Sequence, residues 1–337
     1  MANLNINYMG VDLQTPIIIG ASNMVLKEET LRQLQENGAG AVVFKSLFEE
    51  QLHLEALELD EITRSMDDRH AEMPDPFPDI EHGGPKEYLY QLKKAREILD
   101  IPLFASLNAI KKSSWVEFAK SIAETGVNGL ELNFYSVPKD FEKSSQEIED
   151  ELIDILKAVI DEVDIPVYVK LSPYYANVLN LIKRMDEVGS KGFILFNRLF
   201  EPQIDVETEA HVANMELSNE NQNRLGLRYS GLLYDNIKGS IISSGGIYHG
   251  NDVVKMILAG SDAVQVVSAV LKYKPQHIAK MLKEIDDWMD AHNYTALDDF
   301  RGKLSQKNVN DERIYKRAQY VDLLMRAESI FQKYPMP

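Results

Sequence analysis

Short runs of apolar residues, many of them β-branched, recur along the chain, and a stretch with helical periodicity follows each run. Runs of this length and composition predict buried strands, and their alternation with helices predicts parallel βα units. The predicted strands cover residues 16–22, 41–46, 102–107, 129–134, 166–171, 192–197, 240–244 and 263–268. The predicted helices cover residues 28–37, 86–99, 113–124, 144–159, 174–188, 231–237, 251–258 and 275–290.

Eight strands that alternate with eight helices predict an α/β protein with a closed (β/α)8 TIM barrel. An open, doubly wound sheet is the alternative architecture. The barrel is favoured because the eight apolar runs show no obvious point at which the order of the strands would reverse. In such a barrel the active site lies at the carboxyl ends of the strands.

Two connections and the tail extend this plan. The long loops after strands 2 and 6, residues 47–85 and 198–230, leave the carboxyl ends of strands, and we expect them to roof the pocket. The chain divides into a barrel, residues 1–304, and a C-terminal extension, residues 305–337. Residues 311–333 predict one more amphipathic helix, packed on the barrel or on a neighbouring subunit, and we expect a homodimer.

Composition narrows the classes of partner. The chain has 337 residues, and its 53 acidic and 36 basic residues give a net charge of -17, which disfavours binding to nucleic acid or anionic membranes. Cysteine is absent, which excludes disulfides, thiolate metal sites and a cysteine nucleophile. The first ten residues do not resemble a signal peptide, and no run approaches the roughly 18 apolar residues of a membrane span. We therefore expect a cytoplasmic protein with a small-molecule substrate.

Polar residues gather where the predicted strands end. Lys45 and Lys170 lie inside apolar runs, and a buried ammonium group needs an anion or an acceptor. A barrel carboxylate such as Glu131 is one possible partner, but two lysines at one mouth favour a ligand. The other polar residues expected around the mouth are Ser22, Asn23, Ser46, Asn108, Asn133, Ser136, Asn197, Ser243, Ser244 and Ser268.

A glycine pair follows the seventh predicted strand. Gly245 and Gly246 lead to a helix from Asn251, and Ser268 closes the eighth strand before another helix. Backbone N–H groups and a helix dipole at such a place suit a phosphate, and barrels often bind phosphate after strands 7 and 8. By contrast, His70, Glu81 and His82 lack a spaced third ligand and are interpreted as solvated loop residues, so no metal site is predicted.

The same residues carry a resemblance to a known family. Residues 4–304 resemble the dihydroorotate dehydrogenases, FMN-dependent barrels of pyrimidine synthesis, and within them the soluble class. The most similar segment is IISSGGIYHGNDVVKMILAGSDAVQVVSA, residues 241–269, which resembles the FMN-phosphate region of the family. IGAS, FKS, ELNFYS, VKLSPYY and FRGKL resemble further segments of the family in the same order.

The resemblance implies roles for individual residues. Ser136 would be the catalytic base, and Lys45 would lie between flavin and substrate as a second catalytic residue. The resemblance places Ala21, Ser22, Asn133, Lys170 and Asn197 around the flavin ring, Gly231 at the ribityl-phosphate region, and Gly245, Gly246 and Ser268 at the phosphate. Ser46 and Asn108 join this cofactor-binding set because they end strands 2 and 3.

The chain also departs from the family. The loop after strand 2 reads RSMDDRHAEMPDPFPD and lacks the asparagines that hydrogen-bond orotate in the family, and Val137-Pro138 replaces a Pro-Asn pair. A glycine of the family that precedes Ser268 is Val267 here. A site built to hydrogen-bond a polar ring loses much of its efficiency when its partners are absent. We therefore expect dihydroorotate to be a poor substrate or none.

The sequence thus predicts an FMN-dependent oxidoreductase that moves a hydride from a small polar cyclic substrate, dihydroorotate or a relative, to flavin N5. One alternative is a Schiff-base lyase that uses Lys45 or Lys170 on a phosphorylated substrate, since barrel aldolases also combine a lysine with a phosphate site. The other is a catalytically silent flavin-binding protein.

Overall fold

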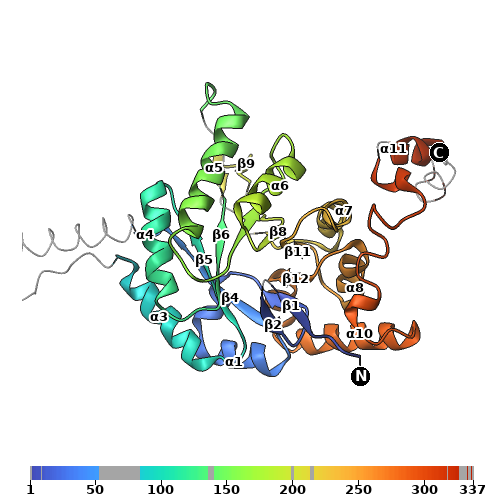
Figure 1. Cartoon of the computed structure of the whole chain (residues 1–337), viewed down its shortest axis with the longest axis horizontal. Helices are drawn as coiled ribbons and strands as arrows, with labels where there is room; N and C mark the ends of the chain where they lie inside the picture. The colour runs from blue at the N-terminus through green and yellow to red at the C-terminus, as the bar shows by residue number, and fades with distance from the viewer. Residues whose placement is uncertain are drawn as a thin grey trace, which may run out of the picture.

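The computed structural model describes residues 2–8, 10–52, 84–135, 140–198, 201–212, 216–316 and 318–325, together with Gln332 and Pro335. Its centre is a closed barrel of eight parallel strands, surrounded by helices (Figure 1). All eight predicted strands are confirmed, and the predicted TIM barrel with them. The barrel strands are β3 (Ile17–Ile19), β4 (Ala41–Phe48), β5 (Leu103–Asn108), β6 (Gly129–Asn133), β7 (Val167–Leu171), β8 (Gly192–Leu195), β11 (Ser240–Ser244) and β12 (Ala263–Val266).

The barrel strands are apolar because both of their faces are buried. Ile17, Ile18 and Ile19, which make up β3, have no exposed surface at all. Strands covered on both faces read as continuous apolar runs instead of alternating ones. The parallel register then brings the polar residues at the strand ends to one mouth, as the pairing of Asn133 in β6 with Lys170 in β7 illustrates.

Helices cover the outside of the barrel (Figure 1). Local signals fix several of their ends: the Ser144 hydroxyl accepts from the backbone N–H of Glu147, whose carboxylate accepts from the N–H of Ser144, so the two form a capping box. The helices are α1 (Glu28–Glu36), α3 (Gly84–Ile98), α4 (Lys112–Ala123), α5 (Ser145–Ile160), α6 (Val178–Val188), α7 (Arg224–Leu233), α8 (Gly250–Ala259), α9 (Ser268–Tyr273), α10 (His277–Ala291) and α11 (Ala318–Met325). Short 3-10 turns are η1 (Asn23–Leu26), η2 (Glu220–Asn223), η3 (Leu297–Asp299) and η4 (Glu312–Tyr315).

The helix predicted at residues 231–237 is misplaced. In the structure α7 begins at Arg224, directly after η2. Asn219 and Gln222 form a capping box at the start of η2, and the turn continues into α7 without a break. This start has no clear signal in the sequence because its cap is an Asn–Gln pair in a polar loop.

Two hairpins and the short helix α9 were not predicted. Strands β1 (Ile6–Tyr8) and β2 (Val11–Leu13) form one hairpin, and Tyr8 is fully buried against Phe104 and Tyr168. Strands β9 (Gln203–Asp205) and β10 (Ala210–Val212) form the other, within the long loop after β8. Both hairpins have strands of three residues, too short to show periodicity.

The C-terminal extension differs from the single helix predicted for residues 311–333. Its described part contains a 3-10 turn, η4, and a separate short helix, α11, and Lys316 between them is extended, with φ -101° and ψ 166°. The extension leaves the barrel beside α7, and α11 stands apart from the barrel (Figure 1). Among the described residues, no helix combines the length and the apolar character needed to cross a membrane.

Candidate active site

Three asparagines meet at the mouth of the barrel. The Asn197 side chain, which follows β8, donates to the side-chain oxygen of Asn133 at the end of β6, with 2.5 Å between the atoms. Asn108, at the end of β5, donates instead to the backbone oxygens of Asn133 (2.8 Å) and Tyr135 (3.3 Å). Asn133 and Asn197 therefore form a polar pair at the mouth, whereas Asn108 fixes the start of the loop after β6.

Lys170 has the carboxylate partner that the sequence analysis gave as its alternative. Its ammonium nitrogen lies 3.7 Å from Glu131 and donates to the Gln265 side chain at 3.0 Å. Gln265 in turn donates to Glu131 at 2.7 Å. Glu131 also accepts from Ser106, whose hydroxyl bonds to that of Ser46 at 2.7 Å. The hydroxyl of Ser46 is therefore committed to this interior network.

Lys45 and Ser22 differ from Lys170 because neither has a partner within the part of the chain that the structure describes. In the described part of the chain, no hydrogen bond or ion pair joins Lys45, which is half-buried in β4, to another residue. The Ser22 hydroxyl, which follows β3 and Ala21, is buried and has no hydrogen-bond partner within the same described residues. Since β3 and β4 are neighbours in the barrel, both groups belong to one side of the mouth.

The predicted phosphate turn comes together with a residue that the sequence analysis missed. Gly245 and Gly246 both have positive φ, 84° and 65°, which favours glycine. The N–H of Gly246 donates to the Ser218 hydroxyl at 3.2 Å, and this hydroxyl bonds to that of Ser268 at 2.8 Å. Ser218 lies in a polar loop before η2, with no local sequence signal, so only the fold reveals its place beside Ser268.

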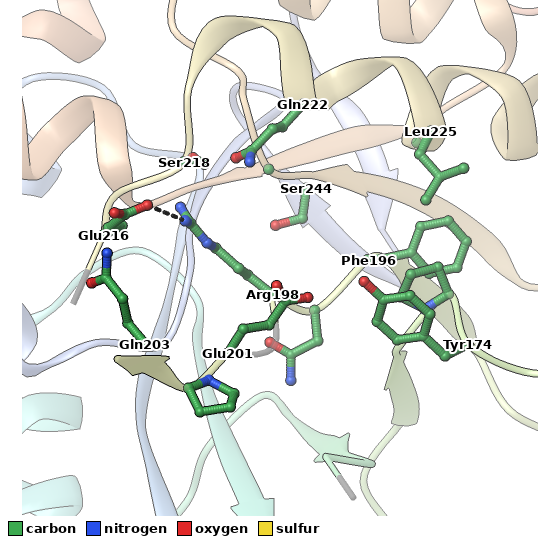
Figure 2. Close-up of a pocket in the computed structure, with 15 residues that line it drawn as sticks. Tyr174, Phe196, Arg198, Glu201, Gln203, Glu216, Ser218, Gln222, Leu225 and Ser244 are labelled. Atoms are coloured by element: carbon green, nitrogen blue, oxygen red, sulfur yellow. Dashed lines mark ion pairs between the residues drawn. The ribbon is translucent and has the colours of Figure 1, made fainter. Parts of the chain in front are cut away.

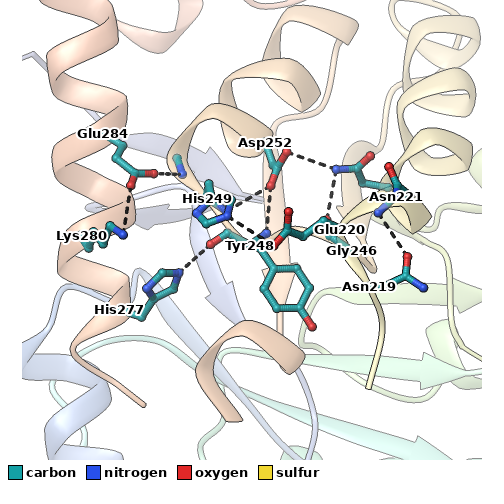
Figure 3. Close-up of polar contacts among 12 residues, drawn as sticks. Asn219, Glu220, Asn221, Gly246, Tyr248, His249, Asp252, His277, Lys280 and Glu284 are labelled. Carbon is teal, nitrogen blue, oxygen red and sulfur yellow. Dashed lines mark hydrogen bonds and ion pairs between the residues drawn. The ribbon is translucent and has the colours of Figure 1, made fainter. Parts of the chain in front are cut away.

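The N-terminus of α8 is not open to a phosphate, in contrast to the prediction. Asp252 accepts from the N–H groups of Tyr248 and His249, both at 3.1 Å, and Glu284 accepts from the N–H of Gly250 at 2.7 Å (Figure 3). These two carboxylates already occupy the positive end of the helix and would repel a further anion. The groups beside this helix that remain available to a phosphate are the Gly245–Gly246 turn, Ser218 and Ser268.

A cavity of about 400 Å³ opens beside this turn, between the ends of β8 and β11 and the start of α7. The Arg198 side chain runs across it toward Glu216, and the rings of Tyr174 and Phe196 lie at its other end (Figure 2). The lining residues are Pro173, Tyr174, Phe196, Asn197, Arg198, Glu201, Pro202, Gln203, Glu216, Ser218, Gln222, Leu225, Gly226, Ser244 and Gly245.

Gly231 does not lie with the other predicted site residues. It is in the second half of α7, and a side chain there would overlap the ring of Tyr315 in the C-terminal extension. Gly226, near the start of α7, lines the cavity instead, and a side chain there would meet Leu195 and Ser243 at the barrel ends. The family resemblance implies a place for Gly231 at the ribityl-phosphate region, whereas in the structure Gly231 packs against Tyr315 and is not among the residues that line the cavity.

Several predicted residues lie outside the described part of the chain: Ser136 and Pro138 after β6, and His70, Glu81 and His82 between β4 and α3. Within the described residues, no three histidine or acidic side chains are arranged to hold a metal ion. Tyr175 follows β7, and burial raises its pKa to about 12, against a smaller opposite effect of a hydrogen bond with Ser172. The Tyr175 phenol therefore stays protonated at neutral pH.

Comparison with known proteins agrees with this architecture. The model of the dihydroorotate dehydrogenase family matches residues 79–289. The chain is 26% identical over 303 residues to a protein of Methanocaldococcus jannaschii named dihydroorotate dehydrogenase B (NAD(+)), catalytic subunit, covering 87% of this chain and 95% of that one. It is 28% identical over 310 residues to dihydroorotate dehydrogenase A (fumarate) of Lactobacillus delbrueckii subsp. bulgaricus, covering 84% and 93%. The chain therefore belongs to the dihydroorotate dehydrogenase family, and it is an oxidoreductase of the kind that acts on CH–CH groups.

Proposed function

We propose that this chain is an FMN-dependent dehydrogenase that oxidises a small, polar, cyclic substrate, either dihydroorotate or a relative of it. The members of its family are flavoproteins. FMN, when bound, would supply the acceptor for a hydride from the substrate. The other contributions come from side chains at the mouth of the barrel.

The observation that carries the proposal is a pair of polar groups, Ser22 after β3 and Lys45 within β4, that have no partner among the described residues. A buried hydroxyl without a hydrogen bond, such as that of Ser22, costs free energy that a polar ligand can recover. Lys45, in the neighbouring strand, has an ammonium group with no acceptor in the described residues. The heteroatoms along the edge of a flavin ring fit these donors.

The remaining mouth residues have distinct tasks in this proposal. Asn133 and Asn197 are already bonded to each other, which would hold their remaining amide groups in a fixed orientation for a ligand. Lys170 is held by Gln265 and Glu131 and would offset negative charge that develops on the cofactor. Ser136 would remove the proton from the substrate, through a relay because the pKa of a serine hydroxyl is far from neutral.

The phosphate of the cofactor would lie at the Gly245–Gly246 turn. Gly245 has open space where a side chain would be, so a ligand can approach its backbone closely. Ser218 and Ser268 bring two hydroxyl groups to the same turn. Each hydroxyl can rotate to donate to a phosphate oxygen.

The test is the flavin content of the purified full-length chain. We expect a yellow protein that releases FMN on denaturation, or a colourless one that binds added FMN with a saturable change in the flavin spectrum. A chain that binds no FMN at any concentration would contradict the proposal. The Schiff-base alternative then makes its own prediction, which is covalent trapping of a carbonyl substrate on Lys45 by borohydride, since Lys170 is engaged with Glu131.

A second measurement separates an enzyme from a silent flavin-binding protein. The flavin-loaded chain is mixed, without oxygen, with a panel of dihydropyrimidines and related ring acids. Bleaching of the flavin band by at least one compound is expected of a dehydrogenase. If none bleaches the band while dithionite does, the chain binds flavin without turning over this substrate class.

A further inference from the structure

We infer that Arg198 is an oxyanion-binding residue, which holds a phosphate or carboxylate group of a ligand in the cavity between β8 and β11. Arg198 follows Asn197 at the end of β8, and its side chain is only 34% exposed. One nitrogen of its guanidinium, Nη1, is buried and has no hydrogen-bond partner in the described residues. A guanidinium is charged at every physiological pH, so a buried nitrogen without an acceptor is costly until an acceptor binds.

The only ion pair of Arg198 in the described residues is a loose one. Its Nη2 lies 3.9 Å from Glu216, beyond hydrogen-bond distance, and the Glu216 side chain is 68% exposed (Figure 2). The pair is weak because its distance exceeds that of a hydrogen bond and because water solvates the exposed Glu216 carboxylate well. A ligand oxyanion that bonds to the guanidinium in a bidentate manner replaces Glu216 at little cost.

Arg198 is the positively charged group that an anion in this cavity would meet. Among the described residues that line the cavity, Arg198 is the one with a positive charge, and Glu201 and Glu216 are the two with a negative charge. The nearby N-terminus of α8 is already neutralised by Asp252 and Glu284 (Figure 3). Ser218 and Ser244, which also line the cavity, add neutral hydroxyl groups beside the guanidinium.

The shape of the cavity identifies the class of ligand. Phe196 and Tyr174 form an aromatic end, and Arg198 reaches away from them toward Glu216 (Figure 2). A planar ring that bears an acid group fits both ends. Two sources have this chemistry: the flavin with its phosphate, and a ring substrate with a carboxylate. The binding of an oxyanion by Arg198 does not depend on the proposed function. Only the choice between these two ligands rests on it.

Paired probes test the inference on the full-length chain. FMN is compared with riboflavin, which lacks the phosphate, and orotate is compared with uracil, which lacks the carboxylate, by titration calorimetry. We expect Arg198→Gln to weaken the binding of FMN or of orotate by about tenfold or more, the loss of one charge-assisted bond. Riboflavin and uracil should bind with unchanged affinity. A loss of affinity for FMN identifies the phosphate as the group that Arg198 binds, and a loss of affinity for orotate identifies the carboxylate.

Matched variants control for folding and for general charge. Arg198→Lys keeps the charge and should bind the same acid with an intermediate affinity, whereas Glu216→Gln removes the competing carboxylate and should tighten binding. The exposed Arg32–Glu28 pair on α1 provides the controls Arg32→Gln and Glu28→Gln, which should change neither affinity. If Arg198→Gln weakens acid and neutral probes equally, or weakens none, the inference is wrong.

The inference and the proposed function fail in different ways. A wild-type chain that binds no flavin contradicts the proposed function, but inorganic phosphate and the pair of orotate and uracil still report on Arg198. A wild-type chain that binds neither phosphate nor orotate nor FMN contradicts the assignment of Arg198 as well.

Discussion

Lys170 and Glu131 lie side by side inside the barrel, 3.7 Å apart, and Gln265 bridges them because it accepts from the lysine and donates to the carboxylate. Glu131 has no exposed surface, and its carboxylate also accepts from Ser106. The charge of Lys170 is therefore fixed in place from inside the barrel. The two lysines that the sequence places in similar apolar runs thus have different environments, because Lys45 has no such partner in the described residues.

Removal of the carboxylate should destabilise the barrel strongly. Glu131→Gln leaves Lys170 buried without its counter-charge, and we expect a loss of about 3 kcal/mol in the free energy of unfolding. The additional change Lys170→Met should restore much of this loss because no buried charge remains. Denaturant unfolding followed by circular dichroism measures both variants.

The control for this prediction is Glu162→Gln, which breaks the exposed pair of Glu162 with Lys120. Surface pairs contribute little, so its unfolding midpoint should shift far less. If Glu131→Gln were no more destabilising than this control, the interior pair would be unimportant for stability.

The two lysines should also differ in function. Lys45→Ala is expected to slow the reduction of bound flavin by substrate about a hundredfold or more, since a charge aimed at the reacting groups is lost. Lys170→Ala should mainly weaken FMN binding or make the reduction of the flavin less favourable. Stopped-flow reduction and a spectroscopic redox titration give the two quantities. The opposite ranking would mean that the roles of the lysines are exchanged.

The sequence predicted the barrel well because its signal is hydrophobic and repeated. Each of the eight strands is short, apolar and buried on both faces, and runs of this kind stand out from the polar helices between them. The helix α7 was misplaced because its start depends on Asn219 and Gln222, a capping pair within a polar loop. Such a pair becomes visible only when the loop is folded.

The site was predictable where the residues end strands, and less so elsewhere. Asn133, Lys170 and Asn197 come together because parallel strands bring their carboxyl ends to one mouth. Ser218 contacts Ser268 although fifty residues separate them in the sequence, and no periodic pattern predicts such a contact. The sequence also does not reveal that Asp252 and Glu284 close the N-terminus of α8, because the contact between Glu284 and Gly250 connects two different helices.

The two glycines of the phosphate turn should respond differently to alanine. At Gly246, a Cβ would lie 2.6 Å from both the oxygen of Asn219 and the nitrogen of Asn223, so Gly246→Ala must displace the start of η2. At Gly245, no atom lies within 4 Å of a Cβ, and only the positive φ opposes the change, at a cost of about 1–2 kcal/mol. We expect Gly246→Ala to lower the melting temperature and FMN affinity more than Gly245→Ala. Equal effects on both quantities would mean that the packing against η2 is unimportant.

Gly231 should act on the C-terminal extension and not on the flavin. Gly231→Ala places a methyl group where the ring of Tyr315 lies, and the hydroxyl of Tyr315 donates to the backbone oxygen of Leu304 at 2.5 Å. We expect faster proteolysis after residue 304, with FMN affinity unchanged. The additional change Tyr315→Ala should remove the clash, so a double variant that is as well folded as Tyr315→Ala alone would support this account. A large loss of FMN affinity in Gly231→Ala would show instead that Gly231 belongs to the cofactor site.

The last prediction concerns dihydroorotate. The segment between β4 and α3 lacks the asparagines that the family resemblance leads us to expect, and Pro138 stands where a side-chain amide is expected. The sequence therefore lacks two or three of the groups expected to hydrogen-bond the ring acid. Each unpaired polar group costs roughly 1–3 kcal/mol, which together lowers catalytic efficiency by several orders of magnitude.

Steady-state oxidation of dihydroorotate, with fumarate, NAD and a quinone as separate acceptors, measures this loss. We expect kcat/KM below about 10⁴ M⁻¹s⁻¹ with every acceptor. Ser136→Ala should abolish whatever turnover remains while leaving FMN bound, because a base for the substrate makes no contribution to holding the cofactor. An efficiency above this range in the wild-type chain would show that dihydroorotate is recognised without the asparagines, through other groups such as Arg198.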